Sequence, residues 1–140
     1  PLWSRGLGDV YKRQAWGSAH SRVTENGNPA LVGNQVAGVP RQTATVGLAW
    51  RPLAQWEGTL TWRRVGRYAV TADNSVFYGG YATWDLGLSW RLPSARSRIY
   101  AVVSNLGDKA YATSASVIRG VPLFAPGAPR TLKVGVQTQF

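Results

Sequence analysis

Most of this chain divides into strand-length segments in which apolar and polar residues alternate. In the closing segment, RTLKVGVQTQF, apolar residues take every second position at Leu132, Val134 and Val136. Lys133 and Gln137 occupy positions of the opposite parity. Alternation with a period of two is typical of a β-strand that has one apolar and one polar face. The pattern therefore predicts an all-β fold.

About six segments have this character, and we expect them to form one antiparallel meander. They lie near residues 15–24, 43–50, 56–63, 84–90, 98–106 and 131–140. The connections between them alternate in length. Residues 51–55 and 92–97 form short turns, and residues 25–40, 71–80 and 107–129 form long loops. Alternate turns of a meander lie at the same end, as in outer-membrane barrels with short turns at one end and long loops at the other.

The aromatic residues also sort by position along the predicted strands. The chain has seven tryptophans in 140 residues, and five of them fall on the apolar faces. We expect an aromatic girdle at the short-turn end, formed by Trp50, Trp56, Trp90 and Phe140. A second aromatic level is expected toward the long loops, where Tyr68, Tyr78, Tyr81 and Tyr111 gather. Two such levels separated by aliphatic residues are typical of a membrane barrel.

The opposite face is small and polar, as the wall of a barrel lumen would be. The residues expected to face the lumen are Glu57, Thr59, Thr61, Asp85, Lys133 and Gln137. A soluble β-sandwich would explain the alternation but not the sorting of the aromatic residues by height. Six strands cannot close a membrane barrel, which needs about eight. The expected fold is therefore a partial transmembrane β-barrel.

The net charge of +10 allows two interpretations of the basic residues. A candidate positive vestibule, which would attract an anionic ligand, comprises Arg63, Arg64, Arg67 and Arg119. The plainer alternative is contact with anionic lipid or with solvent. Binding of nucleic acid requires aromatic and basic residues together on one face. Here the tryptophans and arginines mostly take opposite faces, so we expect no nucleic-acid partner.

No catalytic constellation is evident. The chain has one histidine, His20, and no cysteine, which excludes disulfides and thiolate metal sites. Its six carboxylates are scattered, and no P-loop, G-x-S-x-G or G-x-G-x-x-G motif is present. We therefore expect neither an enzyme nor a cofactor or metal site.

Three segments resemble a known family. NLGDKAYATS (105–114) resembles a segment near the end of TonB-dependent outer-membrane receptors, PGAPRTLKVGVQTQF (126–140) resembles their closing segment, and GNQVAGVPRQTATVGLAWRP (33–52) resembles an earlier loop-to-strand passage. The matching residues are Asn105, Leu106, Asp108, Lys109, Tyr111, Pro126, Gly127, Pro129, Arg130 and Phe140. One departure is Gly107, where the family usually has an aromatic residue.

The resemblance implies a 22-stranded barrel closed by an N-terminal plug, in the outer membrane of a Gram-negative bacterium. It also implies import of a scarce solute, most often a ferric siderophore, driven by the TonB complex through an N-terminal box. The closing strand with its terminal phenylalanine would be read by the barrel-assembly machinery. This chain would supply only the last strands of the barrel, and outer-membrane lipid would surround it.

Residues 1–14 match none of this pattern. They show neither alternation nor helical periodicity, and we expect a non-native-looking or disordered lead-in, with the barrel segment at residues 15–140. Two alternatives to the receptor hypothesis stay open at this point. One is another outer-membrane barrel such as a porin-like channel, and the other is a soluble basic β-domain that binds nucleic acid.

Overall fold

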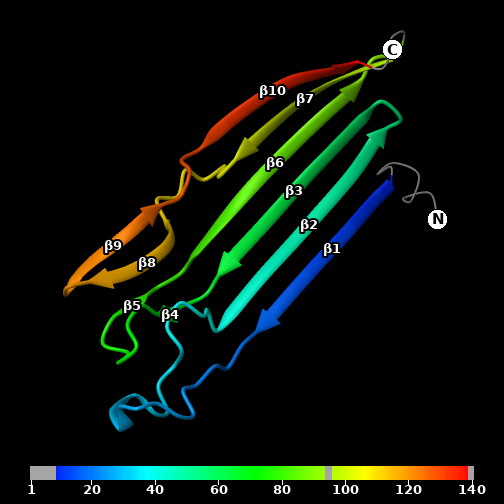
Figure 1. Ribbon diagram of the computed structural model, residues 1–140. Coiled ribbons are helices and arrows are strands. Elements are labelled where there is room, and N and C mark those ends of the chain that lie inside the picture. Colours follow the sequence, from blue (N-terminus) through cyan, green and yellow to red (C-terminus); the bar gives the residue numbers. More distant parts are fainter. Residues whose placement is uncertain (1–8, 94–95, 139–140) are drawn as a thin grey trace.

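A single six-stranded antiparallel sheet dominates the computed structural model, which describes residues 9–93 and 96–138. The sheet order is β1-β2-β3-β6-β7-β10 (Figure 1). Its strands are β1 (Asp9–Ser18), β2 (Gln42–Leu53), β3 (Trp56–Val65), β6 (Tyr81–Arg91), β7 (Ser97–Ser104) and β10 (Thr131–Thr138). Each strand pairs antiparallel with the next one in chain order, which confirms the predicted meander.

Two small hairpins interrupt this order. One pairs β4 (Tyr68–Ala69) with β5 (Phe77–Tyr78), and the other pairs β8 (Ala112–Ile118) with β9 (Val121–Pro126). A 3-10 turn at Pro29–Leu31 is the only helical segment in the part of the chain that the structure describes. None of the described residues belongs to a helix long and apolar enough to cross a bilayer.

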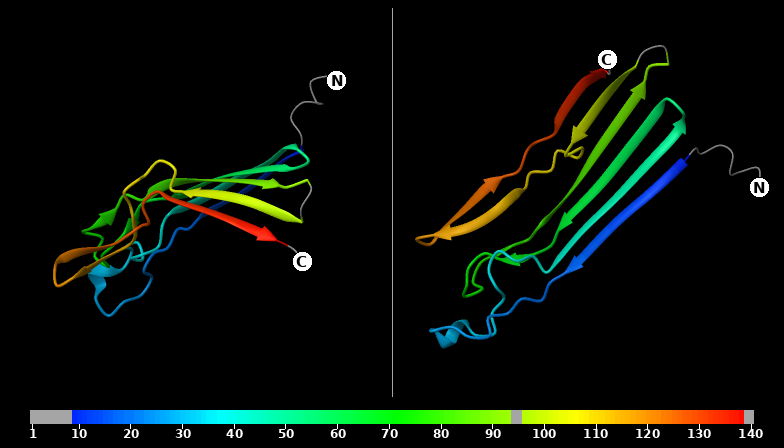
Figure 2. Two further views of the ribbon diagram at one scale, coloured as in Figure 1. Left: turned by 90° about the horizontal axis from the view of Figure 1, so that it is seen from above. Right: turned by 45° about the vertical axis from the view of Figure 1, so that its right-hand side comes forward.

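The connections differ in length according to the end of the sheet at which they lie. Residues 54–55 join β2 to β3, and residues 92–96 join β6 to β7. The three long connections, with both hairpins, project beyond the opposite end of the sheet (Figures 1 and 2). The predicted alternation of short turns and long loops is therefore confirmed.

The first strand begins earlier than the alternation indicates. We predicted a strand near residues 15–24, whereas β1 covers Asp9–Ser18. β2 is twelve residues long, and β1 pairs along nearly all of it, from Asp9 opposite Arg51 to Ser18 opposite Gln42. Residues 9–14 of the predicted lead-in thus take part in the sheet. The boundary at residue 15 stays a prediction.

The last long loop was predicted without internal structure, and this was wrong. Within residues 107–129 the chain forms the β8–β9 hairpin. Its turn consists of Arg119 and Gly120, whose φ angles are 52° and 79°. Two successive residues with positive φ make the kind of two-residue turn that matches the twist of hairpin strands. Arg at the first position is unusual there, which concealed the signal.

The sheet is one layer thick and has no core. In the described residues, only Tyr68, Ala69 and Ala112 are buried hydrophobic residues, and all three lie in the small hairpins. Leu132, Val134 and Val136 on β10 are between 64% and 67% exposed. A soluble domain would cover such a surface with a second layer.

Candidate functional site

One face of the sheet is apolar across five strands. The register places Leu48, Leu60, Leu86, Val103 and Leu132 side by side in one row. The next row toward the short turns contains Trp50, Gly58, Leu88, Ala101 and Val134. Large side chains on this face are exposed, among them Leu48 and Leu88 at 37% and 43%. The face is therefore a continuous apolar surface without a covering layer.

Tryptophans border this apolar surface at the short-turn end. Trp56 and Trp90 are direct neighbours across β3 and β6, and their rings stack 5.8 Å apart. The Trp50 ring lies over Gly58, where any side chain would overlap it. The three tryptophans share one face. Phe140, the fourth predicted member of the girdle, lies outside the described residues.

The second aromatic level differs from the prediction. On the apolar face it consists of Trp62 and Trp84, whose ring centroids are 6.2 Å apart. Tyr81 lies at the far end of β6 but points to the polar face, because it is an odd number of residues from Trp84. Tyr68, Tyr78 and Tyr111 lie outside the main sheet.

The tyrosines do gather at the long-loop end, where they pack the loops together. Tyr81 is 4.4 Å from Tyr111, and Tyr68 is 5.4 Å from Tyr78, measured between ring centroids. Tyr78 also contacts Phe124 of the β8–β9 hairpin, and its hydroxyl accepts a hydrogen bond from the Ala112 amide. Burial raises the pKa of Tyr68, and the neighbouring Tyr78 adds to this effect. The cluster is a small loop core.

The polar face carries every residue predicted to face the lumen. The register aligns Thr59 with Gly87, Val102 and Lys133 in one row of this face. The other four predicted positions also alternate with apolar positions in their strands, and they are Glu57, Thr61, Asp85 and Gln137. The six positions therefore share the polar face of the sheet, and their orientation toward a lumen stays a prediction.

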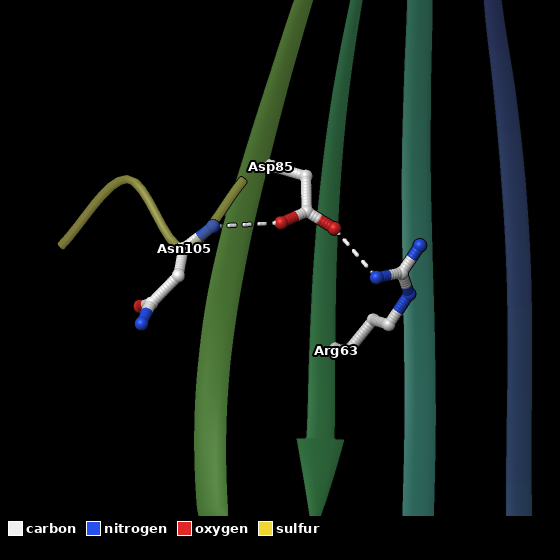
Figure 3. A network of polar contacts seen from close by, with 3 residues as sticks. All are labelled: Arg63, Asp85 and Asn105. Atoms are coloured by element: carbon white, nitrogen blue, oxygen red, sulfur yellow. Dashed lines mark hydrogen bonds and ion pairs between the residues drawn. The ribbon is translucent and has the colours of Figure 1, made fainter. Parts of the chain in front are cut away.

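An ion pair and a hydrogen bond link three strands on the polar face. The Asp85 carboxylate accepts hydrogen bonds from the Arg63 guanidinium and from the Asn105 amide (Figure 3). Arg63 comes from β3, Asp85 from β6, and Asn105 follows β7. Asp85 thus neutralises Arg63 and fixes the point at which β7 ends.

The candidate vestibule residues do not form one cluster. Arg63 pairs with Asp85 on the polar face, whereas Arg64, the next residue, points to the apolar face. The Arg67 guanidinium lies 4.0 Å from the centre of the Phe77 ring, in the loop region. Arg119 lies at the tip of the β8–β9 hairpin. The four arginines therefore occupy separate places along the long-loop end.

The residues of the NLGDKAY segment close the stem of the β8–β9 hairpin. Asn105 is 3% exposed and has a φ of 50°, a conformation that Asn adopts more readily than most residues. Its side chain accepts a bond from the Lys109 amide and donates to the carbonyls of Lys109 and Ala128, at 2.9 to 3.0 Å. Asn105 therefore joins both ends of the long loop.

The other motif residues complete this stem. Asp108, with a φ of 49°, accepts a hydrogen bond from the Arg130 amide at 2.9 Å. The Gly127 amide donates to the Tyr111 carbonyl, and the Tyr111 ring occupies the space where a side chain at Gly127 would lie. A Cβ at Gly107 would meet no atom within 4 Å, so the departure from the family pattern falls at an open position.

The two earlier loops are joined through asparagine and glutamine. Asn74, with a φ of 58°, makes hydrogen bonds to both the amide and the carbonyl of Gln35. Beside it, a hydrogen bond from the Thr71 hydroxyl, followed by bonds from Ser75, lowers the pKa of Asp73. The long-loop end is thus an ordered rim built from polar side chains.

Four arginines at the short-turn end were not singled out from the sequence. Arg51, Arg91, Arg96 and Arg98 line one connected groove with Gln55 and Gln137. The sequence signal was available, because arginine flanks both short turns in WRPLAQW and WRLPSARSR. We overlooked it because basic residues next to turns are usually solvated.

The described residues contain no group of three or more His, Cys, Asp or Glu side chains that could hold a metal ion. Two ion pairs are present in the same residues, Arg51–Glu57 and Arg63–Asp85. The chemistry of the described surface is therefore that of an apolar face, a polar face and a loop rim.

A curved, single-layer meander with these faces and this loop asymmetry is a section of barrel wall. The sequence-family model for the TonB-dependent receptor-like β-barrel matches residues 3–106 of this chain, and the chain belongs to this family. A search of curated proteins found no match.

Solved structures of the same kind share the fold. The siderophore receptor PiuA from Acinetobacter baumannii superposes with a TM-score of 0.81 at 19% identity, over 91% of this chain and 19% of PiuA. The ferric citrate transporter FecA superposes with a TM-score of 0.75 at 20% identity, over 88% of this chain and 20% of FecA. The ferric yersiniabactin uptake receptor FyuA from Yersinia pestis superposes with a TM-score of 0.64 at 28% identity, over 76% of this chain and 17% of FyuA. The chain thus spans about a fifth of the length of these receptors.

Proposed function

We propose that the complete protein is an outer-membrane receptor that imports a ferric siderophore with energy from the TonB complex. The observation that supports this most is the two-faced meander, which superposes on barrels of siderophore and ferric citrate receptors. In this proposal the described sheet is the last part of a 22-stranded barrel, and a plug domain fills the lumen.

In this proposal the two faces of the sheet contact different media, lipid on one side and the lumen on the other. The apolar face, with its leucine row and two levels of tryptophan, lies against lipid. The polar face lines the lumen. Trp50, Trp56 and Trp90 lie at the periplasmic boundary, and the barrel-assembly machinery reads the closing strand at the same end.

The long-loop end faces the exterior, where the ligand arrives. Arg67 and Arg119 lie in loops, and Arg63 lies on the polar face just below them. Arg67 and Arg119 add positive potential at the entrance, whereas Asp85 offsets the charge of Arg63. Arg64, on the apolar face, is assigned to the anionic lipid boundary instead.

We also propose that residues 1–14 are a lead-in that is not native to the barrel, and the register of β1 supports this. Lys12 and Gln14 of β1 lie on the apolar face, in the middle of its rows. Lys12 is opposite Leu48, and Gln14 is opposite Val46. A lysine near the bilayer midplane costs about 2–4 kcal/mol on the lipid face. The complete reading frame from the source genome should therefore carry apolar residues at these two positions, and polar residues there would contradict the proposed boundary.

The uptake function is tested in a receptor-deficient Gram-negative strain grown under iron limitation. We expect the complete receptor to restore growth on at least one class of ferric siderophore and to accumulate radioactive iron. Deleting the TonB protein should abolish uptake, because a plugged barrel opens only with energy. Uptake that persists without TonB would favour the porin-like alternative, and a reading frame under two hundred residues would exclude the receptor.

A further inference from the structure

The short-turn end of the polar face carries an unbalanced positive charge. Arg91 at the end of β6 and Arg98 near the start of β7 are direct partners across the two strands. Both are exposed, as is Arg96 in the turn between them. Like charges placed opposite each other destabilise a sheet unless an anion lies between them.

The carboxylate side chains of the described residues do not supply this anion. Glu57 pairs with Arg51, with 3.4 Å between the carboxylate oxygen and Nε. Asp9 faces Arg51 across β1 and β2, and makes no ion pair within 4.0 Å with another residue in the described ranges 9–93 and 96–138. No described acidic side chain lies within ion-pair distance of Arg91, Arg96 or Arg98.

These arginines line an open groove. One part, about 120 Å³, lies between Arg51, Glu57, Ser89 and Arg98. The adjoining part, about 890 Å³, extends over the second short turn to Gln137 on β10. Gln55, Arg91 and Arg98 line both parts, so the groove is continuous.

The dimensions favour an extended ligand over a single small anion. Arg51 on β2 and Arg98 on β7 are separated by three strand spacings, about 14 Å. A segment of polypeptide with several carboxylates can reach both positions. The amide side chains of Gln55 and Gln137 supply hydrogen-bond donors and acceptors for a peptide backbone.

We propose that this groove, here called the basic groove, binds an acidic peptide segment from the receptor's own upstream domain. The matched receptors are about five times longer than this chain, so most of the polypeptide that could supply the segment lies outside it. The inference rests on the proposed function, in which that domain occupies the lumen. The segment holds the domain against the barrel at its periplasmic mouth.

The test uses the full-length receptor in outer-membrane vesicles, with a photo-reactive benzoylphenylalanine in place of Gln137. The matched control carries it at Val136, the adjacent residue on the opposite face. We expect the Gln137 position to cross-link to an upstream segment of the same chain that contains at least two Asp or Glu residues. The Val136 position should cross-link to lipid.

A second set of variants connects the cross-link to charge. The double variant Arg91→Gln/Arg98→Gln should lower the Gln137 cross-link by at least about fivefold, since two ion pairs are lost. Arg64→Gln, on the apolar face, should leave it unchanged. Heat-modifiable gel mobility verifies that each variant forms its barrel.

The outcomes separate the two proposals. A Gln137 cross-link to lipid, to a different protein or to a segment without acidic residues contradicts the proposal for the basic groove. A cross-link yield that stays the same in Arg91→Gln/Arg98→Gln contradicts it too. No cross-link at Gln137 overturns it as well. A Val136 cross-link to protein instead of lipid overturns the assignment of the faces, and with it the proposed function.

Discussion

Leu60→Arg is expected to block assembly of the complete receptor, whereas Thr59→Arg at the adjacent position should leave assembly nearly intact. Leu60 lies in the central row of the apolar face, between Leu48 and Leu86. Arginine at such a depth on a lipid-facing surface costs about 2–4 kcal/mol. Thr59 is exposed on the polar face, where a charged side chain keeps its water.

The measurement is heat-modifiable gel mobility of the receptor in outer-membrane fractions. The substitution is the same at both positions, and the strand is the same, so the difference reports only the face. Folded barrel should fall several-fold for Leu60→Arg and stay near the parent level for Thr59→Arg. Equal assembly of the two variants would mean that these faces are not lipid and lumen.

Asn105→Ala is expected to release the stem of the β8–β9 hairpin without preventing barrel formation. The change removes three side-chain hydrogen bonds and leaves a residue less suited to a φ of 50°. At about 1 kcal/mol for each bond, the loss is about 3 kcal/mol, or roughly a hundredfold more of the open loop.

Limited proteolysis with trypsin checks this result, because Arg119 lies at the tip of the hairpin. Cleavage after Arg119 should accelerate strongly in Asn105→Ala. Lys109→Ala is the matched control, since Lys109 contacts Asn105 through its backbone amide and carbonyl only. If the control and Asn105→Ala are cleaved at the same rate, Asn105 does not hold the stem.

The main sheet was predictable because a one-layer sheet between two different surroundings leaves a direct pattern in the sequence. Leu60 and Leu86 must meet one medium, and Thr61 and Asp85 the other, so alternation fixes both the strands and their faces. The short turns were also predictable, although β2 continues through residues 51–53, which the prediction had placed in the first turn.

The rim was harder to predict, because its order comes from contacts between distant segments. The Asn105 side chain bonds to Ala128, 23 residues away, and Asn74 bonds to Gln35, 39 residues away. Neither contact follows from local periodicity. The arginines of the vestibule hypothesis showed a related problem, since adjacent positions such as Arg63 and Arg64 point to opposite faces of a strand.

The assignment of the two faces is tested most directly by labelling single cysteines along β10. This chain has no cysteine of its own, so each introduced thiol in this region is a unique reporter. In the complete receptor in vesicles, a charged, water-soluble maleimide should label cysteines at Lys133 and Gln137. It should leave cysteines at Leu132, Val134 and Val136 unlabelled. Labelling of the second set, or equal labelling of both, would contradict the account of a barrel wall with one face toward lipid and the other toward the lumen.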